Sequence, residues 1–500
     1  MTQSSTIIPL FVAISLGGAF LISLLRNKIK WVPDIIGTIV PLILLILSFE
    51  AVAMTNAQGT VVYSLGAWRP PIGIAMVLDG LASFMLVTVN LLAFAIAIFS
   101  IHYMEKFTSK WKFYTLFLLM LAGMNGVIVT GDIFNLFVFL EIAFVASCAL
   151  VAFGTDRHEL EAAFKYAVMG TVGSLFILLG IVFLYSFTST LNMADMAGAL
   201  AVQGPSNIVI LVSVLFIMGF GLKSALVPFH AWLPDAHPSA PAPISAMLSG
   251  VLIKSLGIYA LARIFYNVIG FTESVSVILM VLGTLSMVIG VFLAIGQWDL
   301  KRLLAYHSIS QVGYVVLGIG LGTPLGILGG LFHLFNHSVF KSLLFLNSGS
   351  IEYATGTRDL QKMGGLMKKM PVTGTTNLIA SMSIAGIPPF NGFWSKLIII
   401  IAAVQAGRWG YAFWAVLASL LTLASFTKVM KYAFFGKLND KWNHVKEVPI
   451  TMQISVCILA FICVVGGLLC LPSIVGGFLK PAVDAMTRGL LYSLMVLSNI

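Results

Sequence analysis

Long apolar segments separated by short polar stretches fill almost the whole chain of 500 residues. A membrane's hydrocarbon core is crossed by roughly 20 residues of helix, and most of these segments have that length. The pattern therefore predicts an all-α polytopic membrane protein with about 14 transmembrane helices. The predicted spans are 7–25, 33–53, 74–100, 113–130, 132–153, 161–187, 206–227, 241–265, 274–296, 301–321, 324–349, 372–404, 410–435 and 450–471.

Prolines interrupt this pattern at two places where charged residues lie close by. Pro228 ends the seventh predicted span, and Pro388 and Pro389 divide the twelfth. Proline lacks a backbone donor and clashes with the preceding turn, so helices 7 and 12 are predicted to be broken. Broken helices at membrane depth are tolerated where they are packed in protein or line a wet cavity. The final apolar stretch, 485–500, is short and predicts an interfacial or partner-packed helix.

Composition supports a membrane protein and excludes several other classes. The chain is 59% hydrophobic and 9% charged, with a mean hydropathy of +1.03. No hydrophilic segment is long enough for a separate soluble domain, so redox chemistry would have to come from partner subunits. Segment 7–25 lacks a cleavage site and is predicted to be the first helix, not a removed signal. The four cysteines lie in apolar runs without metal-ligand spacing, so we expect neither a metal site nor a cofactor.

The distribution of lysine and arginine predicts orientation. With the N-terminus outside, most of these residues fall in cytoplasmic loops or at cytoplasmic helix ends, as the positive-inside rule requires. The same distribution explains the net charge of +10 without nucleic acid, and the membrane expected is the cytoplasmic membrane of a prokaryote. The opposite side holds few: Arg69, Arg263, Arg408, Lys480 and Arg488.

The second half of the chain repeats features of the first. Helices 4–8 (113–265) and 9–13 (274–435) would each form a five-helix unit with a broken fourth helix. Because five is odd, the second unit would be inverted in the membrane, an arrangement typical of ion and substrate translocation. Residues 1–112 would hold helices 1–3, and 436–500 would hold helix 14 and the C-terminal segment.

Several ionisable residues lie within predicted spans, where charge is costly and is a candidate for function. Glu141 and Lys223 are expected to pair, either as part of a translocation path or as a lock between two helices. Lys254 lies near the middle of helix 8, too far from an interface for easy snorkelling, and could exchange protons. Lys396 follows the second break and is the candidate terminal site.

Histidines extend this set. His333, His337 and Lys341 share one face of helix 11, because they are spaced four residues apart. Histidine titrates near neutral pH, so this row suits a proton relay, although each ring could also be a hydrogen-bonded core residue. His307 could play the same role. Lys165 could reach the cytoplasmic surface or modulate the Glu141 pair, and His230 lies in a turn that could be solvated or a proton entrance.

At these residues the chain resembles the antiporter-like proton-translocating subunits of respiratory complex I, Mrp-type cation/proton antiporters and membrane-bound hydrogenases. The resemblance covers nearly the whole chain and is carried by TGDIFNLFVFLEI, GLKSALVPFHAWLPDAHPSAPAPISAMLSG, FNHSVFKSLLFL and SIAGIPPFNGFWSK. WRPPIGIAMVLDG and TLNMADM look most like the MrpD-type subunit. The resemblance implies a coupled Glu141–Lys223 pair, a central Lys254, linking histidines on helix 11 and a terminal Lys396.

The function expected is that of a proton-translocating subunit in a multi-subunit complex, driven by redox partners or by exchange against a cation such as Na⁺. The chain itself would carry no redox site. The alternative is a stand-alone secondary transporter of an organic solute, which predicts a roomy polar pocket at the helix breaks.

Overall fold

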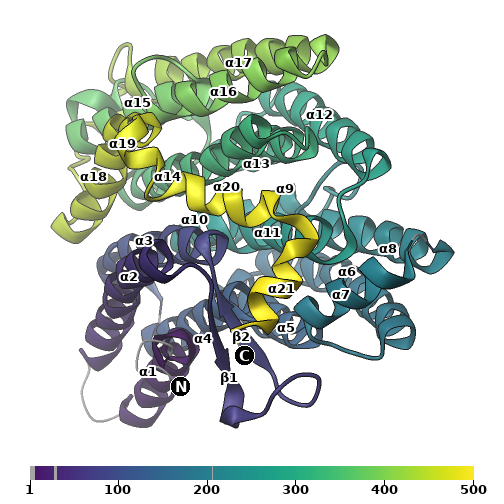
Figure 1. The fold of residues 1–500 in the computed structure, drawn as a ribbon. Helices are drawn as coiled ribbons and strands as arrows, with labels where there is room; N and C mark the ends of the chain where they lie inside the picture. Colours follow the sequence, from purple (N-terminus) through teal and green to yellow (C-terminus); the bar gives the residue numbers. More distant parts are fainter. Residues whose placement is uncertain (1–5, 27–30, 108, 205, 500) are drawn as a thin grey trace.

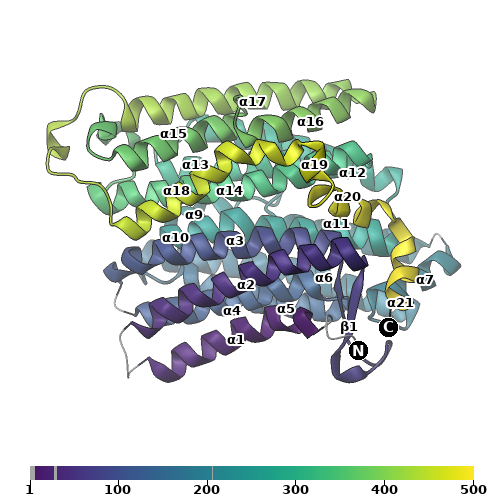
Figure 2. The same cartoon turned by 60° about the vertical axis from the view of Figure 1, so that its left-hand side comes forward.

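The structure, a computed structural model, describes residues 6–26, 31–107, 109–204 and 206–499, with the backbone alone at 253–255. Long helices lie side by side across the molecule (Figures 1 and 2). Within the described ranges, eleven helices are long and apolar enough to cross a membrane. The helices α8 and α16 are apolar but shorter, because each is one half of a broken helix. The all-α membrane fold is thus confirmed, and the number of about 14 crossings stays a prediction.

The N-terminal part and the first five-helix unit follow the predicted order. Their helices are α1 (Ile7–Leu25), α2 (Val32–Gln58), α3 (Gly80–Tyr103), α4 (Lys110–Val129), α5 (Ile133–Val151), α6 (Arg157–Thr188), α8 (Asn207–Lys223) and α9 (Leu233–Ser239). Helix 8 is one continuous rod with four segments: α10 (Ala242–Met247), a π-helix (Leu248–Leu256), α11 (Gly257–Ile264) and a second π-helical turn (Phe265–Ile269).

The second unit and the C-terminal segment complete the chain. The helices are α12 (Glu273–Ile295), α13 (Leu300–Gly320), α14 (Pro324–Thr355), α15 (Pro371–Ala385), α16 (Asn391–Gln405), α17 (Trp409–Val429), which continues as a π-helical turn (Met430–Phe434), and α18 (Ile450–Val465). Three short helices follow: α19 (Pro472–Val475), α20 (Leu479–Thr487) and α21 (Tyr492–Leu497). They cross the front of the bundle in Figure 1, α20 against α3 and α14, and α21 against α7.

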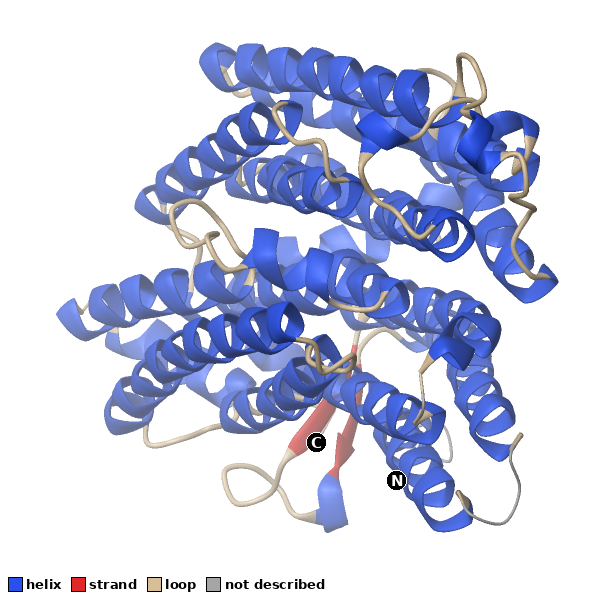
Figure 3. Cartoon of the chain, turned by 180° about the vertical axis from the view of Figure 1, so that it is seen from behind, coloured by secondary structure: helices blue, strands red, loops and turns tan. Residues whose placement is uncertain are grey.

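Two elements correct the sequence prediction. The span predicted at 74–100 begins six residues too early, because Ala75–Leu78 is strand β2, which pairs antiparallel with β1 (Val61–Ser64). Asp79 then caps α3 by accepting a hydrogen bond from the Ala82 amide at 2.9 Å. This hairpin, red in Figure 3, stands at one end of the helices. The short helix α7 (Met193–Gln203) was also not predicted.

Each unit contains a turn of the same form, and the two turns match hydrogen bond for hydrogen bond. In the first unit the turn after α6 meets the start of α5. There the backbones of Asp132 and Asn192 pair as a single antiparallel β-bridge, and the Ile133 amide donates to Leu191 O at 2.9 Å. In the second unit the turn after α14 meets the start of α13. There the backbones of Asp299 and Asp359 pair in the same way, and the Leu300 amide donates to Arg358 O at 3.0 Å.

Threonine hydroxyls repeat in the same two turns. Thr188 and Thr190 in the first correspond to Thr355 and Thr357 in the second, with matching hydrogen bonds. Because side-chain and backbone bonds recur at a constant separation along the chain, this turn supports the prediction of two equivalent units.

Candidate functional site

Glu141 and Lys223 form the ion pair that the sequence predicts. Lys223 is the last residue of α8, and its Nζ lies 3.1 Å from Glu141 Oε1 on α5. Ser174 of α6 donates to the same carboxylate oxygen at 2.5 Å, and the Lys223 ammonium lies 3.7 Å from the centre of the Phe144 ring. A carboxylate, a hydroxyl and an aromatic face together offset the desolvation of the buried ammonium.

The pair lies between two spaces of different size. A cavity of about 30 Å³ is lined by Lys223 on one side of the pair and by Leu252 and Gly257 of helix 8. That volume accommodates a water molecule, which needs roughly 10–15 Å³. On the other side, the Glu141 side chain, 29% exposed, borders an apolar groove of about 510 Å³ between α4 and α5. The pair therefore connects the interior near helix 8 with a lateral surface of the chain.

The helix breaks lie where the prolines predict them. Helix 7 stops at Lys223 and resumes at Leu233, with Pro228 in the intervening turn. Helix 12 stops at Ala385 and resumes at Asn391, with Pro388 and Pro389 between. Each break leaves a lysine beside it: Lys223 before the first and Lys396 after the second. His230 lies half-buried in the first turn.

Lys254 lies in the π-helical part of helix 8, and its side chain is outside the described part of the structure. The surrounding backbone is informative. Residues of α14 contact two backbone carbonyls of the π-helix and one in α10 just before it. Ser342 Oγ donates to Ala246 O at 3.1 Å, Ser338 Oγ donates to Gly250 O at 2.7 Å, and His337 Nε2 lies 3.2 Å from Ser249 O. The predicted helix 11, which is α14 in the structure, is therefore hydrogen-bonded directly to the segment that carries Lys254.

The other two residues of the predicted row lie on either side of His337 in α14. Lys341 is fully buried and donates to Leu304 O of α13 at 2.6 Å. His333 is also fully buried, and its Nδ1 lies 2.9 Å from Ser395 Oγ, next to Lys396 in sequence. The predicted row thus runs along helix 11 with one end toward α13 and the other toward helix 12.

Lys396 occupies the second break. Its Nζ donates to Ile384 O at 2.7 Å, lies 3.3 Å from Ser419 Oγ, and lies 4.8 Å from the centre of the Tyr314 ring. Ile384 is in the last turn of α15, where helix carbonyls carry partial negative charge. The ammonium is therefore held by neutral oxygen atoms and an aromatic face.

Two candidates lie apart from this row. His307 is buried in α13, with Nε2 2.7 Å from Ser425 Oγ, and it neighbours Ser308, whose hydroxyl lies 2.6 Å from Ser249 Oγ. Lys165 is 46% exposed and pairs with Glu161 and Asp235 at 2.9 and 3.0 Å. Of the two alternatives for Lys165, the structure thus favours the surface position over modulation of Glu141.

Sequence reasoning missed two buried cations. Arg263 and Lys301 look like loop-facing charges, yet both are buried. Arg263 binds both oxygens of Asp79, at 2.6 and 2.7 Å, and Lys301 pairs with Glu352 at 3.0 Å. Lys301 shares a helical face with the buried Leu304 and Ser308 of α13, so helical periodicity could have indicated that Lys301 is buried.

Comparisons with known proteins bear on the family to which the chain belongs. A family model described as NADH:quinone oxidoreductase/Mrp antiporter, TM, matches residues 130–422, and one described as NADH-Ubiquinone oxidoreductase (complex I), chain 5 N-terminus, matches residues 70–114. The chain is 37% identical over 398 residues to the D-type subunit of the Na(+)/H(+) antiporter from Alkalihalophilus pseudofirmus, covering 79% of this chain and 80% of the relative. It is 38% identical over 482 residues to the N-type subunit of NADH-quinone oxidoreductase from Desulforudis audaxviator, covering 92% and 94%.

Solved structures give the same result. A chain of the Mrp complex from Dietzia sp. superposes with a TM-score of 0.93 at 28% identity, covering 99% of this chain and all of that one. A chain of the membrane-bound sulfane sulfur reductase, an archaeal respiratory membrane complex, superposes with a TM-score of 0.89 at 31% identity, covering 98% and 99%. The resemblance predicted from the motifs is thereby confirmed, and the chain belongs to the NADH:quinone oxidoreductase/Mrp antiporter transmembrane family.

Proposed function

We propose that this chain is the proton-translocating, antiporter-like subunit of a multi-subunit membrane complex. The observation that carries the proposal is the chain of buried polar groups through the interior. It begins at Glu141 and Lys223, reaches the π-helical segment of Lys254, and continues through helix 11 to the second break. Burying several ionisable residues in a membrane is costly, and a role in proton transfer explains why these residues are present.

Each group has a role that fits its surroundings. The Glu141–Lys223 pair would act as a switch, because separating the two charges changes the field acting on the neighbouring helix 8. Lys254 would accept and release the proton, and His337, His333 and Lys341 would pass it along helix 11. Lys396 would be the last station, because it lies at the break of helix 12, on the opposite side of His333 from Lys341.

The surroundings of Glu141 support membrane partners. A partly exposed carboxylate bordering an apolar groove is poorly accommodated by lipid, so a neighbouring subunit is expected to cover it. The relatives include subunits of Na(+)/H(+) antiporters, which favours exchange of protons against Na⁺ by the assembled complex. The relatives and solved structures named above are subunits of antiporters and of membrane complexes, which argues against a stand-alone solute transporter.

The proposed orientation places the N-terminus outside. In that orientation the basic loops before α4 and α6 and around 357–370 and 436–448 face the cytoplasm, as the positive-inside rule favours.

Substitution of Lys254 tests the proposal. Arginine keeps the positive charge but does not release a proton at any working pH, so Lys254→Arg should assemble normally and lose proton transfer. The measurement is the pH gradient across membrane vesicles that contain the assembled complex, with and without added Na⁺.

The matched control is Lys441→Arg, the same change at an exposed lysine of a polar loop. It should transport like the wild type. Wild-type transport by Lys254→Arg would show that Lys254 supplies only a fixed charge, and the proton path would then have to be drawn without it.

A further inference from the structure

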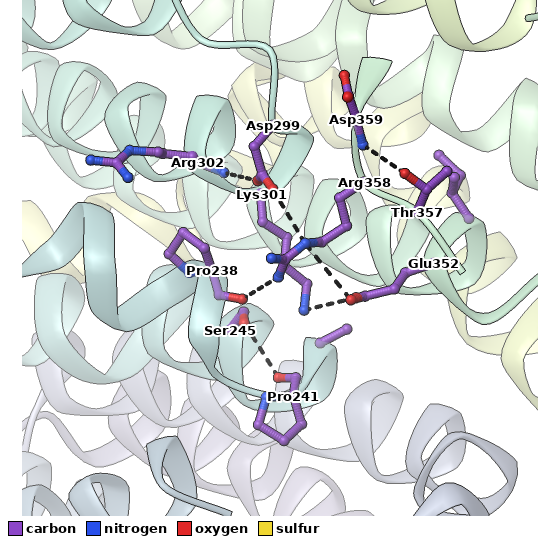
Figure 4. Close-up of polar contacts among 12 residues, drawn as sticks. Pro238, Pro241, Ser245, Asp299, Lys301, Arg302, Glu352, Thr357, Arg358 and Asp359 are labelled. Carbon is purple, nitrogen blue, oxygen red and sulfur yellow. Dashed lines mark hydrogen bonds and ion pairs between the residues drawn. The ribbon is translucent and has the colours of Figure 1, made fainter. Parts of the chain in front are cut away.

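A second group of charges lies where the two five-helix units meet (Figure 4). Lys301, in the first turn of α13, lies 3.0 Å from Glu352 Oε2 in the last turn of α14. Arg358, in the turn after α14, lies 3.3 Å from Asp299 and 3.7 Å from Glu352. Only 3% of the Lys301 side chain is exposed, so this charge has been removed from water. We call Asp299, Lys301, Glu352 and Arg358 the junction cluster.

Both cations of the junction cluster also reach across to the first unit. Lys301 Nζ donates to Ala240 O at 3.1 Å, and Arg358 Nη1 donates to Pro238 O at 2.5 Å. Pro238 and Ala240 lie at the end of α9 and just after it. This short turn joins the second half of broken helix 7 to helix 8. The second unit therefore holds, through two charged donors, the segment between Lys223 and Lys254.

The equivalent turn of the first unit shows that the fold does not need these charges. When the two turns are aligned on their backbone bonds, the positions of Lys301, Glu352 and Arg358 are occupied in the first unit by Phe134, Tyr185 and Leu191. The backbone bonds are nevertheless the same in both turns. Because the turn forms with apolar and aromatic residues in one unit, folding of the turn alone does not explain three charges in the other.

A cavity of about 520 Å³ opens beside the junction cluster. Its lining includes Lys301, Glu352, Asp235 and Pro241, and in the proposed orientation it faces the cytoplasm. One helical turn beyond Lys301, the Leu304 carbonyl accepts the hydrogen bond from Lys341. The junction cluster thus lies between a polar cavity and the buried row of helix 11.

We infer that the junction cluster is a latch that positions the α9–α10 turn, and that Lys301 is a positioning residue for proton uptake from the cavity. Lys301 acts through the Ala240 carbonyl: while the bond is made, helix 8 is held in register with α14. When the bond is lost, the turn and the π-helical segment shift away from helix 11. This inference rests on the proposed function for its consequence, and on the contacts alone for its geometry.

Three variants separate a latch from an ordinary ion pair. Lys301→Met keeps roughly the length of the side chain and removes its charge. It should lower the rate of proton transfer in vesicles by about tenfold to a hundredfold, since a misplacement of about 1 Å near reacting groups can cost about 10²-fold. Lys301→Arg keeps charge and donors and should restore transport. In Lys301→Met combined with Glu352→Gln, charge balance returns but nothing donates to Ala240 O, so the latch predicts that the defect persists. Recovery in the double variant, or wild-type transport by Lys301→Met, would overturn the inference.

Cysteine labelling tests the latch independently of transport. Ser239→Cys, in a background without the native cysteines, places a thiol on the turn beside the cavity. A membrane-impermeant maleimide added from the cytoplasmic side should label it severalfold faster with Lys301→Met than with Lys301→Arg or with the control Lys362→Met, which removes an exposed ion pair. Equal labelling rates would overturn the latch. If Lys254→Arg transports normally while labelling still responds to Lys301, the proposed path through Lys254 fails and the latch stands.

Discussion

At the scale of single residues, the structure stabilises buried lysines in two ways. Lys223 has a carboxylate partner, Glu141, whereas Lys341 and Lys396 donate to backbone carbonyl groups. A carboxylate holds a proton on its lysine through a full charge, whereas a carbonyl does so only through a dipole. Movement or neutralisation of Glu141 would therefore change the electrostatic field at Lys223, whereas the partners of Lys341 and Lys396 carry no net charge.

Ser174 offers a graded test of the Glu141–Lys223 pair. Glu141→Gln removes the negative charge and leaves the Lys223 ammonium buried without compensation, so proton transfer should be abolished in an assembled complex. Ser174→Ala removes only one hydrogen bond to the carboxylate, worth about 1.5–3 kcal/mol, and should reduce the rate without abolishing it. Initial rates of pH-gradient formation check this order. Equal, full loss in both variants would contradict it and would indicate that Ser174 itself carries protons.

At the scale of elements, the break in helix 12 contains a turn that leaves space for the Lys396 side chain. Gly386 ends the first half of helix 12 with φ 80°, a conformation that L-amino acids rarely adopt and that glycine adopts freely. A Cβ atom at this position would lie 3.1 Å from Lys396 Cδ and 3.2 Å from Ser419 Oγ. The glycine therefore serves both the backbone of the break and the space that its lysine occupies.

Alanine substitutions at two glycines separate these effects. Gly386→Ala should cost about 1–2 kcal/mol for the backbone and should also displace Lys396, which impairs proton transfer. Gly407→Ala is the control, because Gly407 has φ 70° but no atom within 4 Å of its added Cβ. Thermal stability of the purified complex should fall similarly in both, and transport should fall only in Gly386→Ala. Equal transport in the two variants would show that the space around Lys396 has no functional role.

The sequence predicted the positions of helices and helix breaks better than it predicted which residues form ion pairs. Continuous apolar length fixes a membrane helix locally, and proline locates a break through its own geometry, so α12, α13 and both breaks were predicted within a few residues. The hairpin was missed because Ala75–Leu78 is as apolar as the helix that follows it. The partners of Lys301 and Arg263 were not predicted, because Glu352 and Asp79 lie far away in the chain and no local pattern links them.

At the scale of the whole molecule, the C-terminal segment joins parts that are distant in sequence. Arg263 of helix 8 holds Asp79 at the start of α3, and Asn267 donates to Ala485 O of α20 at 2.9 Å. Burial alone would raise the pKa of Asp79, but the adjacent Arg263 outweighs it and lowers that pKa below its ordinary value. The carboxylate thus stays ionised throughout the neutral range, and this ion pair closes the side of the bundle opposite the junction cluster in the proposed orientation.

The two shared turns also allow a test of the proposed inverted arrangement. Ser189 ends α6 and is exposed in the turn of the first unit, and Gln361 is exposed just after the equivalent turn of the second. If the units are inverted, these residues lie on opposite sides of the membrane, although their backbone surroundings are alike. Ser189→Cys and Gln361→Cys, each in a background without native cysteines, should therefore react with an impermeant maleimide from opposite sides.

The proposed orientation makes the expectation directional. With the N-terminus outside, Ser189→Cys should be labelled in intact cells and Gln361→Cys only in inverted vesicles. The reverse pattern would keep the inverted units and reverse the orientation, against the positive-inside distribution of lysine and arginine. Labelling of both thiols from one side would be incompatible with inverted units, and the matching hydrogen bonds of the two turns would then need a different explanation.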